Sequence, residues 1–443
     1  MQYQDAIERR NLTAADVSEP RSAIGAVRSV IAGSIGNLIE WYDLFAYTAF
    51  SIYFAKAFFP GDDATVQLLN TAGIFALGFL VRPIGGWVMG AYADLRGRRA
   101  AMTLSVLMMS IGSLAIALCP TYSAIGIAAP VILLVARLLQ GFSVGGEYGT
   151  SATYLSEVAP ARHRGFCSSF QYVTLMGGQL VATSLLLLLQ KLILTSDELE
   201  AWGWRIPFAL GALGAVLAFF LRRRMHETLA VGAESARVAR APLRALFQHP
   251  RAVLIVVGLT IGGTVAAYTY TIYMPRFLVN TVQLSRDTAT SVSFGSLLIF
   301  TVMQPLFGAL SDRVGRRPLL ITFGVLGSIG SVPLLTALSE TRDAFTAFWL
   351  IVAALMIFSC YSSISAVVKA ELFPTEIRAL GVGFPYALTV SLFGGTAEYV
   401  GLWLKSLGNE GLFFWYVSGC IAVSLVCYIV MSETKSRVLI EAR

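Results

Sequence analysis

The sequence contains few charged residues for its length. Only 13% of its 443 residues are charged, whereas 56% are hydrophobic and the mean hydropathy is +0.69. A water-soluble protein of this size needs roughly a quarter of its residues charged to cover its surface, so a soluble fold is excluded. Apolar runs of about 20 residues recur along the chain, and this length crosses a bilayer as a helix. The composition predicts an all-α polytopic membrane protein.

Several chemical signatures are also missing. The sequence has no Gly-Lys dipeptide and hence no G-x-x-x-x-G-K-[ST] phosphate loop, which argues against an ATP-driven pump. Its three histidines, His163, His226 and His249, lie in polar connections, so a buried histidine centre is not expected. The five cysteines have no C-x-x-C spacing and are interpreted as small core residues. We therefore predict no metal, no cofactor and no enzymatic activity. No filter-like loop that would indicate an ion channel is present either.

Twelve apolar segments are long enough to span a bilayer. They cover residues 29–55, 66–91, 100–119, 126–155, 165–190, 204–221, 252–279, 289–311, 318–338, 345–370, 380–404 and 411–431. The mixed charges of residues 1–28 indicate a polar tail and not a cleavable signal, and residues 432–443 form a second tail.

The distribution of basic residues predicts the orientation of these segments. Of the 33 Lys and Arg residues, 23 lie in the two tails and the even-numbered connections, and only six lie in or directly beside the odd-numbered connections. By the positive-inside rule, both termini are expected on the cytoplasmic side of a bacterial inner membrane. This asymmetry also accounts for the net charge of +7, so no nucleic-acid partner is expected.

The chain contains an internal repeat. The segment from Gly90 to Arg99, GAYADLRGRR, follows the second span and recurs as GALSDRVGRR, Gly308 to Arg317, after the eighth. A second pair, Glu157-Val-Ala-Pro160 and Glu371-Leu-Phe-Pro374, is separated by nearly the same offset, about half the chain length. The repeat predicts two six-helix bundles, residues 29–221 and 252–431, joined by a cytoplasmic linker at 222–251. Parallel halves around a midplane cavity are typical of alternating-access transporters.

The repeated G-x-x-x-D-(R/K)-x-G-R-R pattern resembles the signature of the major facilitator superfamily; the second copy is complete and the first differs only at Leu95. Further segments resemble its metabolite:proton symporter family across nearly the whole chain: Glu40-Trp-Tyr-Asp43, Arg82-Pro-Ile-Gly-Gly86, Gly145-Gly-Glu-Tyr148, Phe170-Gln-Tyr-Val-Thr174, Trp202-Gly-Trp-Arg-Ile-Pro207 and Ala370-Glu-Leu-Phe-Pro374. The resemblance implies the twelve-helix major facilitator fold and a monomeric, proton-coupled carrier.

Two carboxylates in the first span are candidates for proton coupling. Glu40 and Asp43 lie roughly 17 to 23 Å from the cytoplasmic end of that span, near the bilayer centre. A carboxylate at this depth costs a few kcal/mol unless it is paired or protonated. In proton-linked sugar carriers of the superfamily, a first-span Asp and a fourth-span Arg form the coupling pair, and the resemblance implies this role for Asp43 and Arg137. Glu40 is the alternative proton site. The structural alternative is that Asp43 and Arg137 form a static ion pair that joins two helices. Glu398 in the eleventh span could be either a proton relay or a packing residue.

An anionic substrate requires fixed positive charge and hydrogen-bond donors. Arg137 and Lys369 are the candidate anchors, since guanidinium and ammonium groups bind carboxylates; for Lys369 the alternative is an interfacial side chain. Phenols and amides within the fifth and seventh spans are candidate donors, with membrane-interface or helix-packing roles as the alternatives: Gln171, Tyr172, Tyr268 and Tyr270.

A further set of charged residues is expected to gate the pathway. By resemblance, the charges of the repeated motif latch neighbouring helix ends in one state and separate in the other. The expected gating residues of the motif are Asp94, Arg98, Asp312 and Arg316, and Glu147 on the fourth span is expected to pair with the gate arginines. Arg82, which precedes Pro83, is expected to be structural or gating, with substrate contact as the alternative.

These observations together predict a secondary transporter that takes up a small carboxylate together with protons, and the family resemblance implies a dicarboxylate such as α-ketoglutarate as the substrate. The alternatives are another metabolite of the same family, such as citrate, a C4-dicarboxylate or shikimate, or a neutral substrate such as a sugar, in which case Asp43 and Arg137 would neutralise each other.

Overall fold

The computed structural model describes residues 23–61, 64–222 and 246–435, which are almost entirely helical. The first half contains six long helices: α2 (Ala23–Phe58), α3 (Ala64–Arg96), α4 (Arg98–Leu118), α6 (Ala128–Val158), α7 (Arg164–Leu188) and α9 (Arg205–Arg222). The second half contains α12 (Pro250–Ala267), α13 (Met274–Asn280), α14 (Arg286–Val314), α15 (Arg316–Glu340), α16 (Ala344–Ser362), α17 (Ser365–Glu371), α18 (Arg378–Thr389), α19 (Gly395–Ser406) and α20 (Glu410–Val430). Shorter connecting elements include α5 (Tyr122–Ile125) and α8 (Ser196–Glu198).

The long helices correspond to the twelve segments predicted from the apolar runs. Within the described residues, ten helical stretches are long and apolar enough to cross a membrane, and the bent pair Ser196–Gly203 and Arg205–Phe220 forms an eleventh. The remaining long helix is α2, which carries Glu40 and Asp43. It begins at Ala23, earlier than the predicted start at residue 29, because a helix can extend past its apolar run until a breaker intervenes. Most of the predicted tails, 1–22 and 436–443, and of the linker, 223–245, lie outside the described residues.

Three spans of the second half are irregular. The seventh passes from α12 through a π-helical segment, η4 (Tyr268–Tyr273), into α13, and the eleventh passes from α18 through η6 (Val390–Gly394) into α19. The tenth is interrupted between α16 and α17, around Ser363 and Ile364. Such interruptions often mark functional sites because they free backbone groups and redirect side chains.

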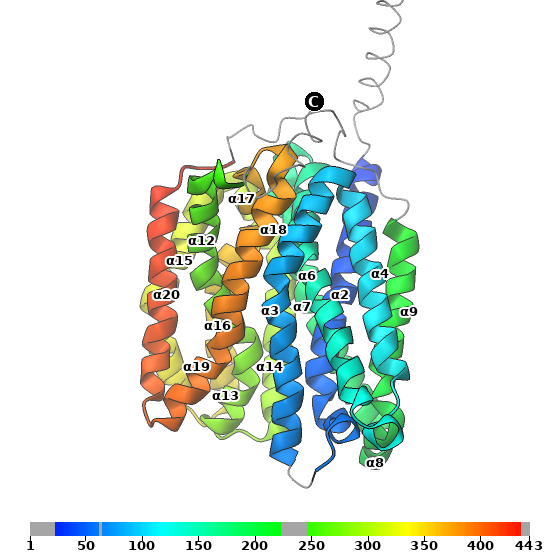
Figure 1. Cartoon of the computed structure of the whole chain (residues 1–443). Helices are drawn as coiled ribbons and strands as arrows, with labels where there is room; N and C mark the ends of the chain where they lie inside the picture. The colour runs from blue at the N-terminus through cyan, green and yellow to red at the C-terminus, as the bar shows by residue number, and fades with distance from the viewer. Residues whose placement is uncertain (1–22, 62–63, 223–245, 436–443) are drawn as a thin grey trace, which may run out of the picture.

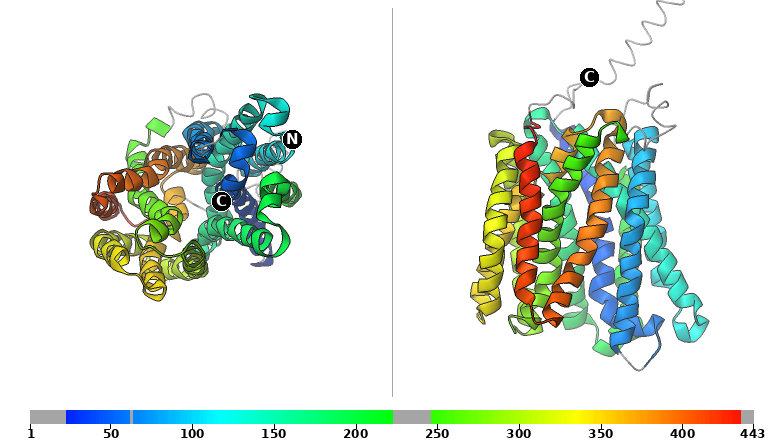
Figure 2. Two further views of the ribbon diagram at one scale, coloured as in Figure 1. Left: turned by 90° about the horizontal axis from the view of Figure 1, so that it is seen from below. Right: turned by 60° about the vertical axis from the view of Figure 1, so that its left-hand side comes forward.

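The helices form two groups that lie side by side (Figures 1 and 2). Between the groups, α3 and α6 pack against α18, and α7 packs against α14. In Figure 1, α9 ends and α12 begins towards the upper end of the bundle, which we call the linker end. The elements α8, α13 and α19 lie towards the opposite end.

The two halves approach each other at glycines near the linker end. A Cβ atom added to Gly149 on α6 would lie 2.5 Å from the Cα of Gly383 on α18, and one added to Gly90 on α3 would lie 2.9 Å from the Cα of Leu380. Because no side chain separates these backbones, the halves are in direct contact there. The structure is therefore closed at the linker end.

Candidate functional site

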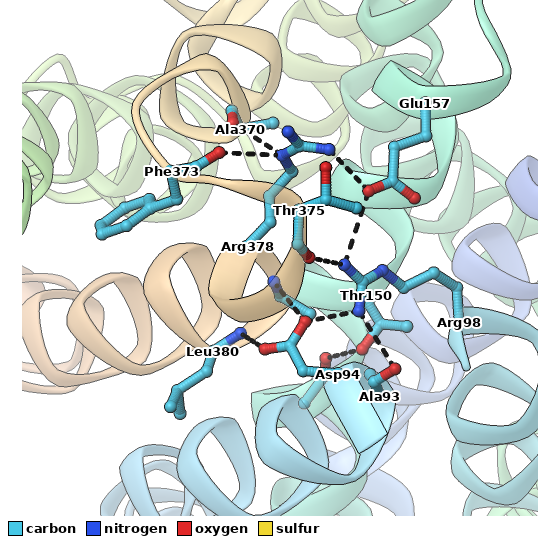
Figure 3. A network of polar contacts seen from close by, with 12 residues as sticks. Ala93, Asp94, Arg98, Thr150, Glu157, Ala370, Phe373, Thr375, Arg378 and Leu380 are labelled. Carbon is cyan, nitrogen blue, oxygen red and sulfur yellow. Dashed lines mark hydrogen bonds and ion pairs between the residues drawn. The ribbon is translucent and has the colours of Figure 1, made fainter. Parts of the chain in front are cut away.

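The first copy of the repeated motif forms a latch across the two halves. Asp94, at the end of α3, accepts hydrogen bonds from the backbone N–H groups of Ala379 and Leu380 (3.1 and 2.9 Å) in the first turn of α18 (Figure 3). The first N–H groups of a helix have no partner within that helix, and they carry its positive dipole end. The carboxylate of one half therefore caps a helix of the other half.

Arginines of both halves complete this first latch. Arg98 pairs with Asp94 and donates to the Thr375 carbonyl across the interface (2.7 Å). Arg378 of the second half reaches back to Glu157 of the first half (2.7 Å), and Glu157 also lies 3.5 Å from Arg98 (Figure 3). All four side chains are buried, so both charges of each ion pair have been removed from water. Deleting one partner of such a pair is strongly destabilising.

The second copy forms an equivalent latch in the reverse direction. Asp312 on α14 accepts hydrogen bonds from the N–H groups of Gly165 and Phe166 (2.8 and 2.9 Å) at the start of α7 in the first half. Arg316 pairs with Asp312 (2.8 Å) and lies 3.7 Å from Glu371. The two halves are thus capped crosswise, and both latches are formed in this closed state. The predicted gating residues Asp94, Arg98, Asp312 and Arg316 all belong to them.

The chain after α20 braces the second latch. Glu433 accepts hydrogen bonds from the N–H groups of Arg316 and Arg317 (3.0 Å each) at the start of α15, and the Thr434 hydroxyl donates to Glu371. Burial raises the pKa of Glu433, but these N–H groups and those of Thr434 and Lys435 outweigh it and hold the pKa below its ordinary value. Glu433 therefore remains ionised at physiological pH and fixes the start of α15.

Asp43 lies in a buried polar chain within the first half. Its side chain is 0% exposed, and its Oδ2 accepts a hydrogen bond from the Ser113 hydroxyl (2.5 Å). Gln140 donates to Ser113 (2.8 Å), and Arg137 donates to the Gln140 amide oxygen (2.6 Å). Asp43 and Arg137 are thus both inside the bundle, but they are connected through two neutral side chains. The direct ion pair that the resemblance implied is not present in this state.

The other carboxylate oxygen of Asp43 has a different environment. Oδ1 lies against Gly211 on α9, and it has no hydrogen-bond partner in the part of the chain that the structure describes. An ionised carboxylate with an unsatisfied buried oxygen is costly, and a neutral, protonated carboxyl group in the same place costs less. The geometry at Asp43 therefore suits a group that exchanges a proton.

Glu40 is the second buried acid of α2 and contacts serines of two neighbouring helices. Its Oε1 accepts hydrogen bonds from Ser105 on α4 (2.8 Å) and Ser143 on α6 (3.3 Å). Glu147 is also buried on α6. Glu40 and Asp43 are therefore held separately, by different serines.

Arg137 and Arg82 each lie over aromatic rings. The Arg137 guanidinium is 4.1 Å from the Tyr47 ring centroid, and that of Arg82 is 3.5 Å from the Phe79 centroid. Arg82 also lies within reach of the Tyr268 hydroxyl. Such cation–π contacts partly compensate a buried positive charge. Arg82 was predicted to be a gating residue, but none of its contacts with the described residues belongs to either latch.

Lys369 lies deep between the halves. It is 0% exposed on α17, and its ammonium group donates to the Tyr148 hydroxyl of the first half (3.0 Å). Tyr148 stacks on Tyr386 of the second half with 3.5 Å between ring centroids, and the Lys369 nitrogen lies 4.4 Å from the Tyr386 centroid. The alternative that the Lys369 side chain reaches the membrane–water interface is therefore wrong, because the side chain is buried between the two halves.

The remaining predicted substrate residues are divided between the interface and the interiors of the halves. Tyr268 and Tyr172 contact residues of the opposite half, Phe79 (6.2 Å between centroids) and Phe358 (6.0 Å). Tyr270 instead donates to Ser331 (3.0 Å) within the second half. Gln171 lies inside the first half, where Ser151 donates to it (2.9 Å), and it donates to Asn37 (3.3 Å). The structure thus gives Tyr270 and Gln171 helix-packing contacts.

Glu398 lies apart from these buried clusters. Its side chain is 25% exposed on α19 and forms an ion pair with Arg276 on α13, whose side chain is also exposed. This ion pair joins α13 to α19 and gives Glu398 a helix-packing contact, and its role as a proton relay stays a prediction. In the described part of the chain, no group of three or more His, Cys, Asp or Glu residues could hold a metal ion.

Sequence reasoning did not identify several residues that complete the site. Ser113 and Gln140 look like ordinary polar residues of apolar spans, and Tyr148 and Tyr386 become partners only when the halves meet. Glu157 and Arg378 could have been found, because the repeated Glu-x-x-Pro segments are each followed by an arginine, Arg164 and Arg378.

Comparison with known proteins agrees with this architecture. The family model described as sugar (and other) transporter matches residues 29–237 and 225–443. The chain is 50% identical to the alpha-ketoglutarate permease of Escherichia coli K12 over 88% of this chain and 90% of that protein. It is 34% identical to the citrate-proton symporter of Klebsiella pneumoniae over 84% and 83%.

Solved transporters share the fold. The crystal structure of a D-xylose-proton symporter superposes with a TM-score of 0.67 at 21% identity, covering 93% of this chain and 99% of that one. A partially occluded, inward-open xylose transporter from Escherichia coli superposes with a TM-score of 0.69 at 19% identity, covering 93% and 99%. The twelve-helix fold predicted from the sequence is confirmed. The chain therefore belongs to the sugar (and other) transporter family of the major facilitator superfamily and is a multi-pass membrane transporter.

Proposed function

We propose that the protein is a proton symporter that takes up a small dicarboxylate, such as α-ketoglutarate, by alternating access. The observation that carries the proposal is the chain from Asp43 through Ser113 and Gln140 to Arg137, which connects a buried acid to a buried guanidinium. When the acid is protonated, the positive charge of Arg137 is available to an anion. When the acid loses its proton, its negative charge offsets that of Arg137 and weakens the attraction for the anion. The names of the permease and the citrate symporter support carboxylate as the substrate class.

The proposal includes an orientation. The excess of Lys and Arg in the even-numbered connections favours a cytoplasmic location for the linker end, with both termini on that side of a bacterial inner membrane. The crosswise latches would then close the pathway towards the cytoplasm. A monomer suffices for this mechanism, because each chain supplies both halves.

Uptake should depend on both the proton gradient and the membrane potential. Moving one net charge against 100 mV costs about 2.3 kcal/mol, so a dianion that enters with fewer than two protons is opposed by an inside-negative potential. We expect the purified protein in proteoliposomes to accumulate labelled α-ketoglutarate faster when the exterior is acidic, with at least two protons per substrate. Proton uptake and substrate uptake measured in the same vesicles give the ratio.

The same assay tests the alternatives. Indifference of uptake to both the pH gradient and the voltage would exclude symport. Competition by citrate, succinate, shikimate, proline and glucose defines the substrate class, and displacement by glucose but not by dicarboxylates would favour the neutral-substrate alternative.

Replacing Arg137 by lysine should reduce transport by at least about tenfold. Lysine keeps the positive charge but loses the planar fork that bonds Gln140 and stacks over Tyr47 and Phe75 (4.1 and 5.3 Å). Initial uptake rates in proteoliposomes at matched protein density measure the effect.

The matched control is Arg205→Lys. Arg205 also stacks on an aromatic ring, Trp204 at 4.2 Å, but it bonds the carbonyls of Ala117 and Cys119, away from the buried polar chain. Equal loss in both variants would assign the effect to stability, and normal transport by Arg137→Lys would show that Arg137 is not part of the mechanism.

A further inference from the structure

The buried cations of the described residues fall into three groups. Arg98, Arg316 and Arg378 form ion pairs with carboxylates in the latches. Arg137 has no direct ion pair but is connected to Asp43 through Gln140 and Ser113. Arg82 and Lys369 are equally buried, but no carboxylate of the described chain lies within ion-pair distance of either. A buried charge without a counter-ion is costly. Its retention indicates a ligand that supplies the missing negative charge.

These two cations come from opposite halves and lie near the same turn of α18. Lys369 of α17 lies 4.4 Å from the Tyr386 ring centroid. Arg82 lies on α3, one turn before Gly86, and a Cβ added to Gly86 would lie 3.1 Å from the Cβ of Ala387, the residue that follows Tyr386 on α18. The helix that carries Arg82 in the first half therefore packs against the turn of α18 that Lys369 of the second half contacts.

The surroundings of the two cations suit carboxylate groups. The Tyr148 hydroxyl accepts the hydrogen bond from Lys369 and can in turn donate its own proton. The Tyr268 hydroxyl is in the corresponding position beside Arg82. The rings of Phe79 and Trp41, at 3.5 and 5.9 Å from the Arg82 guanidinium, exclude water from that end and strengthen the attraction for an anion.

We propose that Arg82 and Lys369 form a two-point clamp, in which each cation holds one carboxylate of a linear dicarboxylate and the substrate bridges the two halves. The clamp rests on the proposed function and specifies its binding site. It assigns Arg82 to substrate contact instead of gating, and it makes the second carboxylate of the substrate, rather than its carbon skeleton, the feature that is recognised.

The clamp predicts how each variant will discriminate between ligands. We compare α-ketoglutarate with 2-oxopentanoate, which has the same chain length but lacks the second carboxylate. A charge-assisted hydrogen bond is worth about 1.5–3 kcal/mol, so Lys369→Gln and Arg82→Gln should each weaken α-ketoglutarate binding about 10- to 100-fold. Binding of 2-oxopentanoate should change far less in at least one of these two variants, since a single carboxylate needs only one cation.

Binding is measured by calorimetry and by ligand-induced thermal stabilisation of the purified variants. Lys369→Arg is the charge-preserving variant and should keep the preference for the dicarboxylate. Lys405→Gln is the matched control, because Lys405 is in the same half but pairs with Glu410 at 3.7 Å near the opposite end. Removal of an unpaired buried charge should not lower the melting temperature of the ligand-free protein.

The outcomes separate the clamp from the proposed function. Preference for α-ketoglutarate that is lost in both glutamine variants and kept in Lys369→Arg supports the clamp. Wild-type preference that survives in either glutamine variant overturns the clamp and leaves dicarboxylate symport intact. A wild-type protein that binds neither ligand but binds a neutral solute overturns both.

Discussion

Asp43→Asn should lose proton-driven accumulation and keep substrate exchange. Asparagine has the shape of a protonated aspartic acid and can still accept a hydrogen bond from Ser113, but it cannot release a proton. The substrate-loaded carrier should therefore still change between its two states, whereas the proton gradient no longer drives it. One pH unit is worth about 1.4 kcal/mol, or tenfold, per coupled proton. At zero membrane potential, we expect the variant to accumulate at least about tenfold less substrate than the wild type for each unit of imposed pH gradient. Its exchange rate should fall less than about threefold.

The measurement uses two assays on the same vesicles. Uptake into empty proteoliposomes under an imposed pH gradient reports coupling, and exchange of external labelled for internal unlabelled substrate without a gradient reports movement of the loaded carrier. Glu40→Gln is the matched control, since it neutralises an acid of the same helix that bonds Ser105 and Ser143. Uncoupling by Glu40→Gln with normal accumulation by Asp43→Asn would move the proton site to Glu40.

Gly149→Val should prevent closure at the linker end. A Cβ at Gly149 would lie 2.5 Å from the Cα of Gly383 and 2.7 Å from the carbonyl oxygen of Ala379, both in the backbone of the opposite half. These contacts join α6 to α18 and penalise only the closed state. Overpacking of about 3 kcal/mol shifts the balance between the closed and open states on the order of 100-fold, and net uptake should fall accordingly.

Accessibility of a buried cysteine gives a direct readout of this state. Ala379→Cys, in a background without the five native cysteines, places a thiol at a position that is 0% exposed in the closed state. Gly149→Val should allow an impermeant maleimide to label it from the linker side. Gly419→Val on α20, where a Cβ meets nothing within 4 Å, should leave it protected. Protection in both variants would show that the glycine contact does not control closure.

The fold was predictable because its causes are local. A bilayer fixes the length of an apolar helix, and the repeated G-x-x-x-D segments indicate two equivalent halves before any contact is known. Irregularities within spans were not predictable. The sequence Tyr268–Tyr273 has no proline or glycine, yet it adopts a π-helical segment, and the break before Lys369 contains only ordinary helix-compatible residues. Both arise from packing between helices, which the linear sequence does not contain.

The candidate site was predictable only in part for the same reason. A charged residue in an apolar run is conspicuous, so Asp43, Arg137, Arg82 and Lys369 could all be singled out. Their partners could not, because Ser113 and Gln140 come from α4 and α6 and resemble dozens of other polar residues. The role of Arg82 depended on whether a carboxylate lies nearby, and that is a property of the folded interface.

The crosswise capping has a consequence for how the pathway opens. The donors at positions 165, 166, 379 and 380 are main-chain amides, which every amino acid except proline possesses. When the latches open, the four amides and the two carboxylates need no new side-chain partner, because water can form hydrogen bonds with all of them. Each transport cycle therefore takes up and expels water at both latches. Solutes that are excluded from protein surfaces should accordingly favour the closed form and make the carrier responsive to osmotic strength.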